Sequence, residues 1–214
     1  MIEILPSILV GTKIEFEEKV RIVEPHCERA HLDIADGIFV PNKTIDGFLE
    51  LEQIETELLF TVHLMVSKPE NHIARWLEIP RGVEGIVFHA EATQKHIEVI
   101  NLIKEGDCEA GIALNPATPH SAISEWVDLV DFVHFMTVEP GFYGGKFVDS
   151  VVDKIKDFHY FYPDKPIRVD GAVTPETAPR LIEAGATSLV VGHYLFLGKS
   201  LEEQLAQLKM QISK

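Results

Sequence analysis

The sequence predicts an α/β fold, a closed (β/α)8 barrel that forms a single domain over residues 1–214. Short apolar segments alternate with segments of helical periodicity eight times, and no linker or shift in composition divides them. Such alternation is typical of βαβ units around a parallel sheet. Eight units in 214 residues fit a compact barrel with few insertions. An open doubly wound sheet is the alternative, but the turn after the first strand, Val10-Gly11-Thr12, lacks the glycine-rich fingerprint usual there.

The expected strands are short apolar runs, and several end at a polar residue, a proline or a glycine. Residues 31–37 form a strand that leads into a loop, and alternation puts His31 and Asp33 on the face opposite Leu32. The eight expected strands are residues 2–10, 31–37 with its loop, 58–66, 85–89, 110–114, 131–138, 166–170 and 187–191.

The expected helices are recognised by apolar spacing and by their end signals. Phe16, Val20 and Val23 lie at helical spacing. Pro69 stands where a helix can begin, and Gly185 stands where one can end. The expected helices are residues 13–23, 46–57, 70–77, 93–104, 120–126, 147–160, 175–184 and 200–212.

Charge and composition exclude several classes of function. Hydrophobic residues make up 46% of the chain, which is too many for a disordered protein. With 19 Lys and Arg against 34 Asp and Glu, the net charge is -15, which argues against nucleic acid or an anionic membrane surface as partner. A phosphorylated ligand would therefore be held by local backbone dipoles or by a metal.

The remaining composition favours a soluble cytoplasmic protein. Cys27 and Cys108 are too few for a disulfide framework, and we interpret both as reduced structural thiols. No apolar run reaches the roughly 18 residues of a membrane span. Because the first residues already resemble a strand, no signal peptide is expected before the domain.

Polar residues gather at the carboxyl ends of the expected strands, where barrels place their active sites. Two imidazoles and two carboxylates in this set, His31, Asp33, His63 and Asp170, predict a site for a divalent ion, because zinc, iron, manganese and cobalt accept such ligands. The alternative is that these histidines are structural or simply face water. The other residues at strand ends are Ser7, His89, Glu91, Asn115 and Met136.

Glycine-bearing turns follow the last three expected strands, at residues 141–145, 171–172 and 192–193. Loops after strands seven and eight of a barrel commonly hold a phosphate through backbone N–H groups. Glycine lets the backbone approach such a ligand closely. A phosphate site is the favoured interpretation, and glycines that only permit tight turns are the alternative.

Nearly the whole chain resembles the ribulose-phosphate 3-epimerase family, motif by motif. Together the matches are highly specific, although each is weak alone. The segments that resemble family motifs are Leu5-Pro6-Ser7-Ile8-Leu9 (PSIL), residues 31–42 (HxDxMDGxFVPN), His63-Leu64-Met65-Val66 (HLMV), Phe88-His89-Ala90-Glu91 (FHxE), Leu114-Asn115-Pro116-Ala117-Thr118 (LNPxT), residues 136–142 (MxVxPGF) and Val169-Asp170-Gly171 (VDG).

The resemblance implies a ribulose-phosphate-binding TIM barrel that inverts C3 of a ketose phosphate, first of all D-ribulose 5-phosphate to D-xylulose 5-phosphate. It implies one divalent metal, with zinc expected first and iron, manganese or cobalt as alternatives, held by His31, Asp33, His63 and Asp170. Asp33 and Asp170 would exchange protons with opposite faces of the substrate through a metal-stabilised enediolate. It also implies a homo-oligomer, a dimer or larger. The implied substrate-binding residues are Ser7, His63, Met65, Met136, Gly141, Gly144, Gly145, Gly171, Ala172, Gly192 and His193.

The chain departs from the family motifs around the expected phosphate. Ala35 replaces a methionine, which predicts a roomier wall and favours D-allulose 6-phosphate as an alternative substrate. Ala172 replaces a glycine, which is awkward if the position needs positive φ. The other departures are Glu139, Tyr143, Gly145 and His193. A weakly active sugar-phosphate-binding paralogue is a second alternative, and an unrelated zinc hydrolase is a third that the absence of an HExxH helix weakens.

Overall fold

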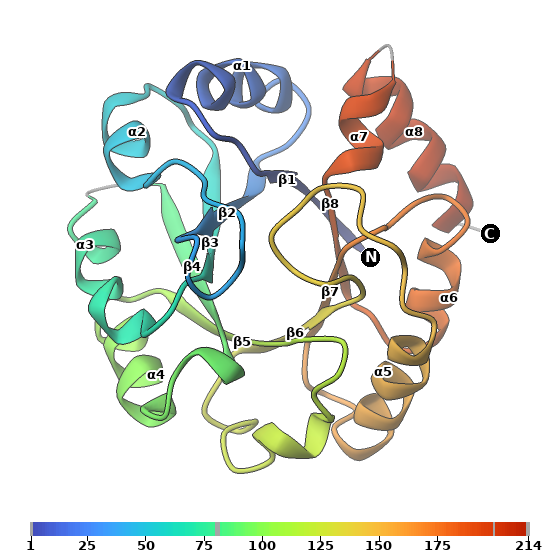
Figure 1. Ribbon diagram of the computed structural model, residues 1–214. Helices are drawn as coiled ribbons and strands as arrows, with labels where there is room; N and C mark the ends of the chain where they lie inside the picture. The colour runs from blue at the N-terminus through green and yellow to red at the C-terminus, as the bar shows by residue number, and fades with distance from the viewer. Residues whose placement is uncertain (1, 80–81, 199, 213–214) are drawn as a thin grey trace.

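Eight parallel strands close into a barrel in chain order, as expected from the alternating pattern (Figure 1). The computed structural model describes residues 2–79, 82–198 and 200–212, so the ends of the expected domain, residue 1 and residues 213–214, lie outside it. The strands are β1 (Glu3–Ile8), β2 (Arg29–Ala35), β3 (Leu59–Met65), β4 (Val83–His89), β5 (Glu109–Leu114), β6 (Phe132–Met136), β7 (Ile167–Asp170) and β8 (Ser188–Val191).

Helices surround the strands and lie outside the barrel (Figure 1). The α-helices are α1 (Lys13–Val23), α2 (Phe48–Gln53), α3 (Ile73–Leu77), α4 (His96–Glu105), α5 (Ser150–Phe161), α6 (Ala178–Glu183), α7 (His193–Leu197) and α8 (Leu201–Ile212). Short 3-10 segments are η1 (Pro69–Asn71), η2 (Ala90–Ala92) and η3 (His120–Ile123). None of the described helices is long and apolar enough to cross a membrane.

The first helix shows how local sequence sets these elements. Thr12 caps α1, because its hydroxyl accepts a hydrogen bond from the Glu15 backbone while the Glu15 side chain accepts one from Thr12 N–H. The apolar positions Phe16, Val20 and Val23 then pack against the strands and are fully buried.

Three parts of the helical prediction are wrong. The α-helix expected over residues 120–126 is only the 3-10 segment η3, so no α-helix separates β5 from β6. This stretch is short, and a helix so short is marginal unless tertiary packing supports it. The helix expected over residues 70–77 is split into η1 and α3, and α7 was not predicted.

Alternation along the strands separates an apolar layer from a polar one. Leu32, Val62 and Phe88 belong to the large buried cluster that strands and helices share. The opposite faces point into the barrel, whose interior is largely polar: His31, Thr61, His63, His89, His134, Arg168 and Asp170 are all buried.

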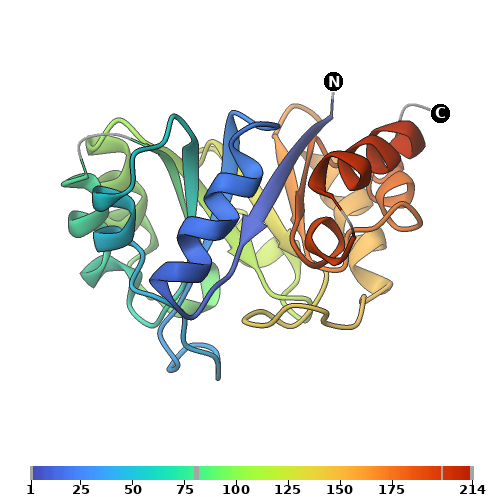
Figure 2. The ribbon, with the colours of Figure 1, turned by 90° about the horizontal axis from the view of Figure 1, so that it is seen from above.

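The ends of the barrel differ in kind. The loop after β2 and the loop after β6 project from one end, while both chain termini lie at the other (Figure 2). The projecting end is the carboxyl end of the strands, and the candidate site lies there.

Candidate active site

Strand register explains why residues far apart in sequence meet in the barrel. In the parallel β2–β3 pair, Asp33 lies beside His63. Nδ1 of His63 lies 2.8 Å from Oδ1 of Asp33 and 3.8 Å from Oδ2 of Asp170. Nε2 of His31 lies 3.6 Å and 3.9 Å from the same two oxygens. The structure therefore brings together all four residues expected to bind a metal.

A third imidazole, His134 on β6, joins this cluster and was missed in the sequence. Its Nε2 lies 3.5 Å from Oδ2 of Asp170, and its ring stacks on that of His31 with centroids 5.3 Å apart. The two-residue alternation of side chains along a strand could have predicted its place, since His134 lies two residues before Met136 and therefore on the same face. The four groups His31, His63, His134 and Asp170 each offer an atom within 4.8 Å of the others.

The donor set fits a divalent cation. Both ring nitrogens of His31 and of His134 lack a hydrogen-bond partner although the side chains are fully buried. Buried polar atoms without partners are costly, and neutral imidazole nitrogens together with a carboxylate are ligands that zinc and related ions prefer. A cation in this cluster would supply a partner for one nitrogen of each ring.

The electrostatics of the cluster favour the neutral forms of His31 and His134. Burial, and the nearby charges of His63, His134 and Arg168, hold the pKa of His31 well below its usual value. Burial also lowers the pKa of His134, with Arg168 as the second cause. For Asp170, burial and the charge of Asp33 raise the pKa to about 7. Asp170 therefore resists ionising beside a charged Asp33 unless a cation is near.

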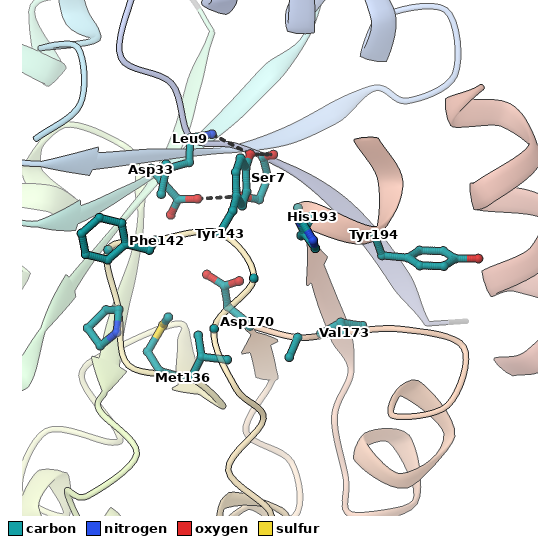
Figure 3. Close-up of a pocket in the computed structure, with 18 of the residues that line it drawn as sticks. Ser7, Leu9, Asp33, Met136, Phe142, Tyr143, Asp170, Val173, His193 and Tyr194 are labelled. Atoms are coloured by element: carbon teal, nitrogen blue, oxygen red, sulfur yellow. Dashed lines mark hydrogen bonds between the residues drawn. The ribbon is translucent and has the colours of Figure 1, made fainter. Parts of the chain in front are cut away.

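A pocket of about 290 Å³ opens above the cluster. Ser7 and Asp33 enter it from β1 and β2, and Asp170 enters from β7 (Figure 3). The carboxylates of Asp33 and Asp170 point toward the same space (Figure 3). The expected substrate-binding residues that line it are Ser7, Met65, Met136, Gly141, Gly144, Gly145, Gly171, Ala172, Gly192 and His193. His63, also expected to touch substrate, does not line the pocket and is fully buried behind it.

Ser7 orients Asp33. Its hydroxyl donates a hydrogen bond of 2.5 Å to Oδ2 of Asp33 (Figure 3). The other oxygen, Oδ1, faces His63. The two oxygens of Asp33 thus have different neighbours, and the carboxylate is fixed by both.

Tyr143 fastens the glycine-rich loop to the first strand. Its hydroxyl donates to the carbonyl of Ser7 at 2.7 Å and accepts from Leu9 N–H at 2.8 Å (Figure 3). Nζ of Lys19 donates to the same oxygen at 3.1 Å. A β-carbon at Gly192 would collide with the Tyr143 ring, which explains a glycine at that position.

The glycine turns expected to hold a phosphate line one side of the pocket. No lysine or arginine is among the described residues that line it, and His193 is the one imidazole there. Gly171 and Ala172 both have positive φ, at 103° and 46°. Ala172 thus adopts the left-handed conformation, which costs an alanine about 1–2 kcal/mol of strain and which a glycine adopts readily.

Ala35 does not itself line the pocket. It is buried against Val40 and Met65, and of these Met65 does line the cavity.

The barrel is closed and eight-stranded, and buried imidazoles and carboxylates lie at the carboxyl ends of its strands, below a glycine-lined pocket. These features define the class, a TIM-barrel enzyme whose mouth has a cluster that could hold a metal. A solved structure described as 3-hexulose-6-phosphate synthase shares this fold, with a TM-score of 0.74 at 13% identity over 99% of this chain and 100% of that one.

Sequence comparison narrows the class to one family. Residues 3–196 match the Ribulose-phosphate 3 epimerase family. The chain is 40% identical over 204 residues to ribulose-phosphate 3-epimerase of Bacillus subtilis, covering 92% of this chain and 93% of that protein. It is 38% identical over 211 residues to the chloroplastic ribulose-5-phosphate-3-epimerase of Arabidopsis thaliana, covering 95% of this chain and 75% of that protein. The chain belongs to the ribulose-phosphate 3-epimerase family.

Proposed function

We propose that this protein is a metal-dependent epimerase that inverts C3 of a ketose phosphate, converting D-ribulose 5-phosphate to D-xylulose 5-phosphate. The observation that carries the proposal is the pair of carboxylates, Asp33 and Asp170, that face one pocket above shared imidazoles. Inversion needs a proton carrier on each face of the carbon, and two opposed carboxylates supply both.

In this proposal Asp33 and Asp170 alternate as base and acid. One takes the proton from C3 while the other, protonated, delivers a proton to the opposite face. A divalent cation held by His31, His63, Asp33 and Asp170 would stabilise the negative charge that develops on the substrate oxygens.

The walls of the pocket support the same chemistry. Met65 and Met136 contribute apolar thioethers beside the reacting carbon, which would keep water from the intermediate. Backbone N–H groups around the glycine turns would hold the phosphate.

Several finer points belong to the proposal. Zinc is the metal we propose, because imidazole and carboxylate suit it, with iron, manganese and cobalt as alternatives. We further propose that one barrel domain over residues 1–214 carries the activity, as a homo-oligomer in the cytoplasm. A phosphorylated ketose is the proposed partner, and the net charge of -15 opposes nucleic acid.

The test is an epimerisation assay of purified protein with each metal, on D-ribulose 5-phosphate and on D-allulose 6-phosphate. Because Ala35 does not line the pocket, we expect the five-carbon substrate to be preferred. Asp33→Asn and Asp170→Asn should each lower kcat by about 10²–10⁴-fold, with metal content measured alongside. Asp149→Asn, an exposed carboxylate paired with Arg180, is the matched control.

Two outcomes would overturn the proposal. No C3 epimerisation of either substrate with any of the metals would remove the enzymatic function. Sugar-phosphate binding without solvent-deuterium exchange at C3 would instead establish the binding paralogue.

A further inference from the structure

His63 is the first member of a line of buried groups that leads away from the pocket. Its Nδ1 faces Asp33, and its Nε2 lies 2.9 Å from Nε2 of His89. The other nitrogen of His89, Nδ1, lies 3.6 Å from Oε2 of Glu91. Both imidazoles are fully buried, and the ring of Phe39 covers His89 with centroids 4.8 Å apart. The line thus runs from Asp33 through two rings to Glu91.

Proton counting leaves few arrangements for two facing nitrogens. When both rings are neutral, each carries one ring proton, and one Nε2 must donate to the other. If His63 keeps its proton on Nδ1, His89 must donate from Nε2 and present a lone pair to Glu91. If His63 carries its proton on Nε2, His89 accepts it there and turns an N–H toward Glu91.

The carboxylates at the two ends favour opposite arrangements. Asp33, at 2.8 Å, draws a proton to Nδ1 of His63. A metal requires the lone pair of that same nitrogen, since it is the one that faces Asp33 and Asp170. Glu91 favours a proton on Nδ1 of His89, which in turn places the His63 proton on Nε2. The metal-ready arrangement is therefore the one that Glu91 stabilises.

Glu91 is held in place as an anion. Its Oε1 accepts hydrogen bonds from Asn115 N–H at 2.8 Å and from the hydroxyl of Thr118, which leaves Oε2 for His89. Although burial acts to raise the pKa of Glu91, the nearby His89 ring and the hydrogen bonds from Thr118 and Asn115 lower it to about 2. Nδ1 of His89, at 3.6 Å, has no hydrogen-bond partner among the described residues, so its interaction with Glu91 is electrostatic. Nζ of Lys154 donates to the carbonyls of Asn115 and Thr118, which fixes the turn that holds the carboxylate.

We propose that Glu91, acting through His89, is a positioning residue that sets the tautomer of His63, with the proton on Nε2 and the lone pair of Nδ1 directed into the metal cluster. The inference rests on the metal site of the proposed function. It gives a role to the His89 and Glu91 pair, which contacts neither the pocket nor the reacting carbon. Outer partners of metal ligands commonly act in this way, and their loss costs about 10–100-fold in metal affinity.

The first test reads the tautomers directly in the intact, zinc-loaded protein. Long-range ¹H–¹⁵N correlation spectra distinguish protonated from unprotonated ring nitrogens. We expect the proton of His63 on Nε2 and that of His89 on Nδ1. A His89 proton on Nε2 in the zinc-loaded protein would overturn the proposal.

The second test measures zinc affinity of the metal-free protein by competition with a chromophoric chelator. Glu91→Gln should weaken zinc binding about 10–100-fold, and Glu91→Asp should restore part of it. Glu98→Gln, the same change at an exposed carboxylate paired with Lys95, should leave the affinity unchanged. Zinc affinity of Glu91→Gln within twofold of the unsubstituted protein would overturn the proposal.

This measurement is independent of turnover. A protein that epimerises its substrate but binds zinc equally well with Glu91→Gln retains the proposed function and loses this inference. A protein that shows the expected loss of zinc affinity but no epimerisation retains this inference and loses the proposed function.

Discussion

His134 is an imidazole enclosed by charged and polar groups, among them His31, Asp170 and Arg168. It is fully buried, both ring nitrogens lack partners, and Arg168 on the neighbouring strand adds a positive charge that disfavours protonation. The Arg168 guanidinium is itself buried and lies over the Phe132 ring at 4.1 Å. A buried imidazole beside a positive charge is compatible with the fold only when it is neutral or when one of its nitrogens binds a metal.

The lowered pKa of His134 predicts acid sensitivity of the metal-free protein. In the unfolded chain His134 binds a proton near pH 6.5, whereas in the folded chain its lowered pKa keeps it unprotonated at that pH. The free energy of unfolding is therefore highest above pH 6.5 and decreases as pH falls. The substitution His134→Leu removes this pH dependence. The stability of the unsubstituted protein relative to this variant should fall by about 1 kcal/mol between pH 7.5 and pH 5.5.

Urea unfolding of the chelated proteins at several pH values measures this difference. His26→Leu, which replaces an exposed imidazole, serves as the control and should give a curve parallel to that of the unsubstituted protein. A parallel curve for His134→Leu as well would show that the folded protein protonates this ring freely.

Among the elements, the loop over residues 140–145 forms one wall of the pocket. The hydroxyl of Tyr143 joins this loop to Ser7 at the end of β1 and to Leu9, the residue just after β1. Ser7 also donates a hydrogen bond to Asp33, so one side chain links the loop to the strand that orients this carboxylate. Fixing a loop in its binding conformation lowers the entropic cost of binding.

Tyr143→Phe should loosen this loop while leaving the ring in place. The Ser7 carbonyl and the Leu9 N–H would lose their partner, so we expect stability to fall by about 1–3 kcal/mol. KM for the phosphorylated sugar should rise about tenfold with kcat nearly unchanged, since the lost interaction affects binding rather than the chemical step.

Steady-state kinetics and thermal unfolding check this prediction. Tyr160→Phe removes a hydroxyl from a side chain that is 81% exposed and should change neither quantity. A fall in kcat at constant KM would show that Tyr143 acts on the chemical step instead.

For the whole molecule, a cation held by the cluster would link metal binding to folding. The strands bring His31, His63, His134 and Asp170 together only when the barrel closes. The unfolded chain presents them far apart, so a bound cation would favour the folded state and stabilise it.

Zinc should therefore raise the melting temperature of chelated protein. Free zinc at 100 times its dissociation constant adds about 2.7 kcal/mol, which corresponds to about 5–10 °C for a chain of this size. Calorimetry with and without zinc measures the shift. Asp170→Ala should reduce it sharply, and an equal shift in that variant would place the cation elsewhere.

The barrel itself could be predicted because its signals are local. The alternation of strand and helix patterns and the apolar face marked by Leu32 and Phe88 depend on neighbours in sequence. Helix ends were less predictable, as η3 shows, because packing rather than propensity decides whether a short helix forms.

Side-chain alternation and chain order are enough to predict the closed parallel barrel and the polar residues at the ends of its strands. Three features become visible only in the folded chain: His134 joins His31 and His63, Tyr143 reaches Ser7, and Ala35 packs behind Met65 without lining the pocket. These contacts join residues on different strands and loops, and their distances depend on how the barrel closes, which no local pattern records.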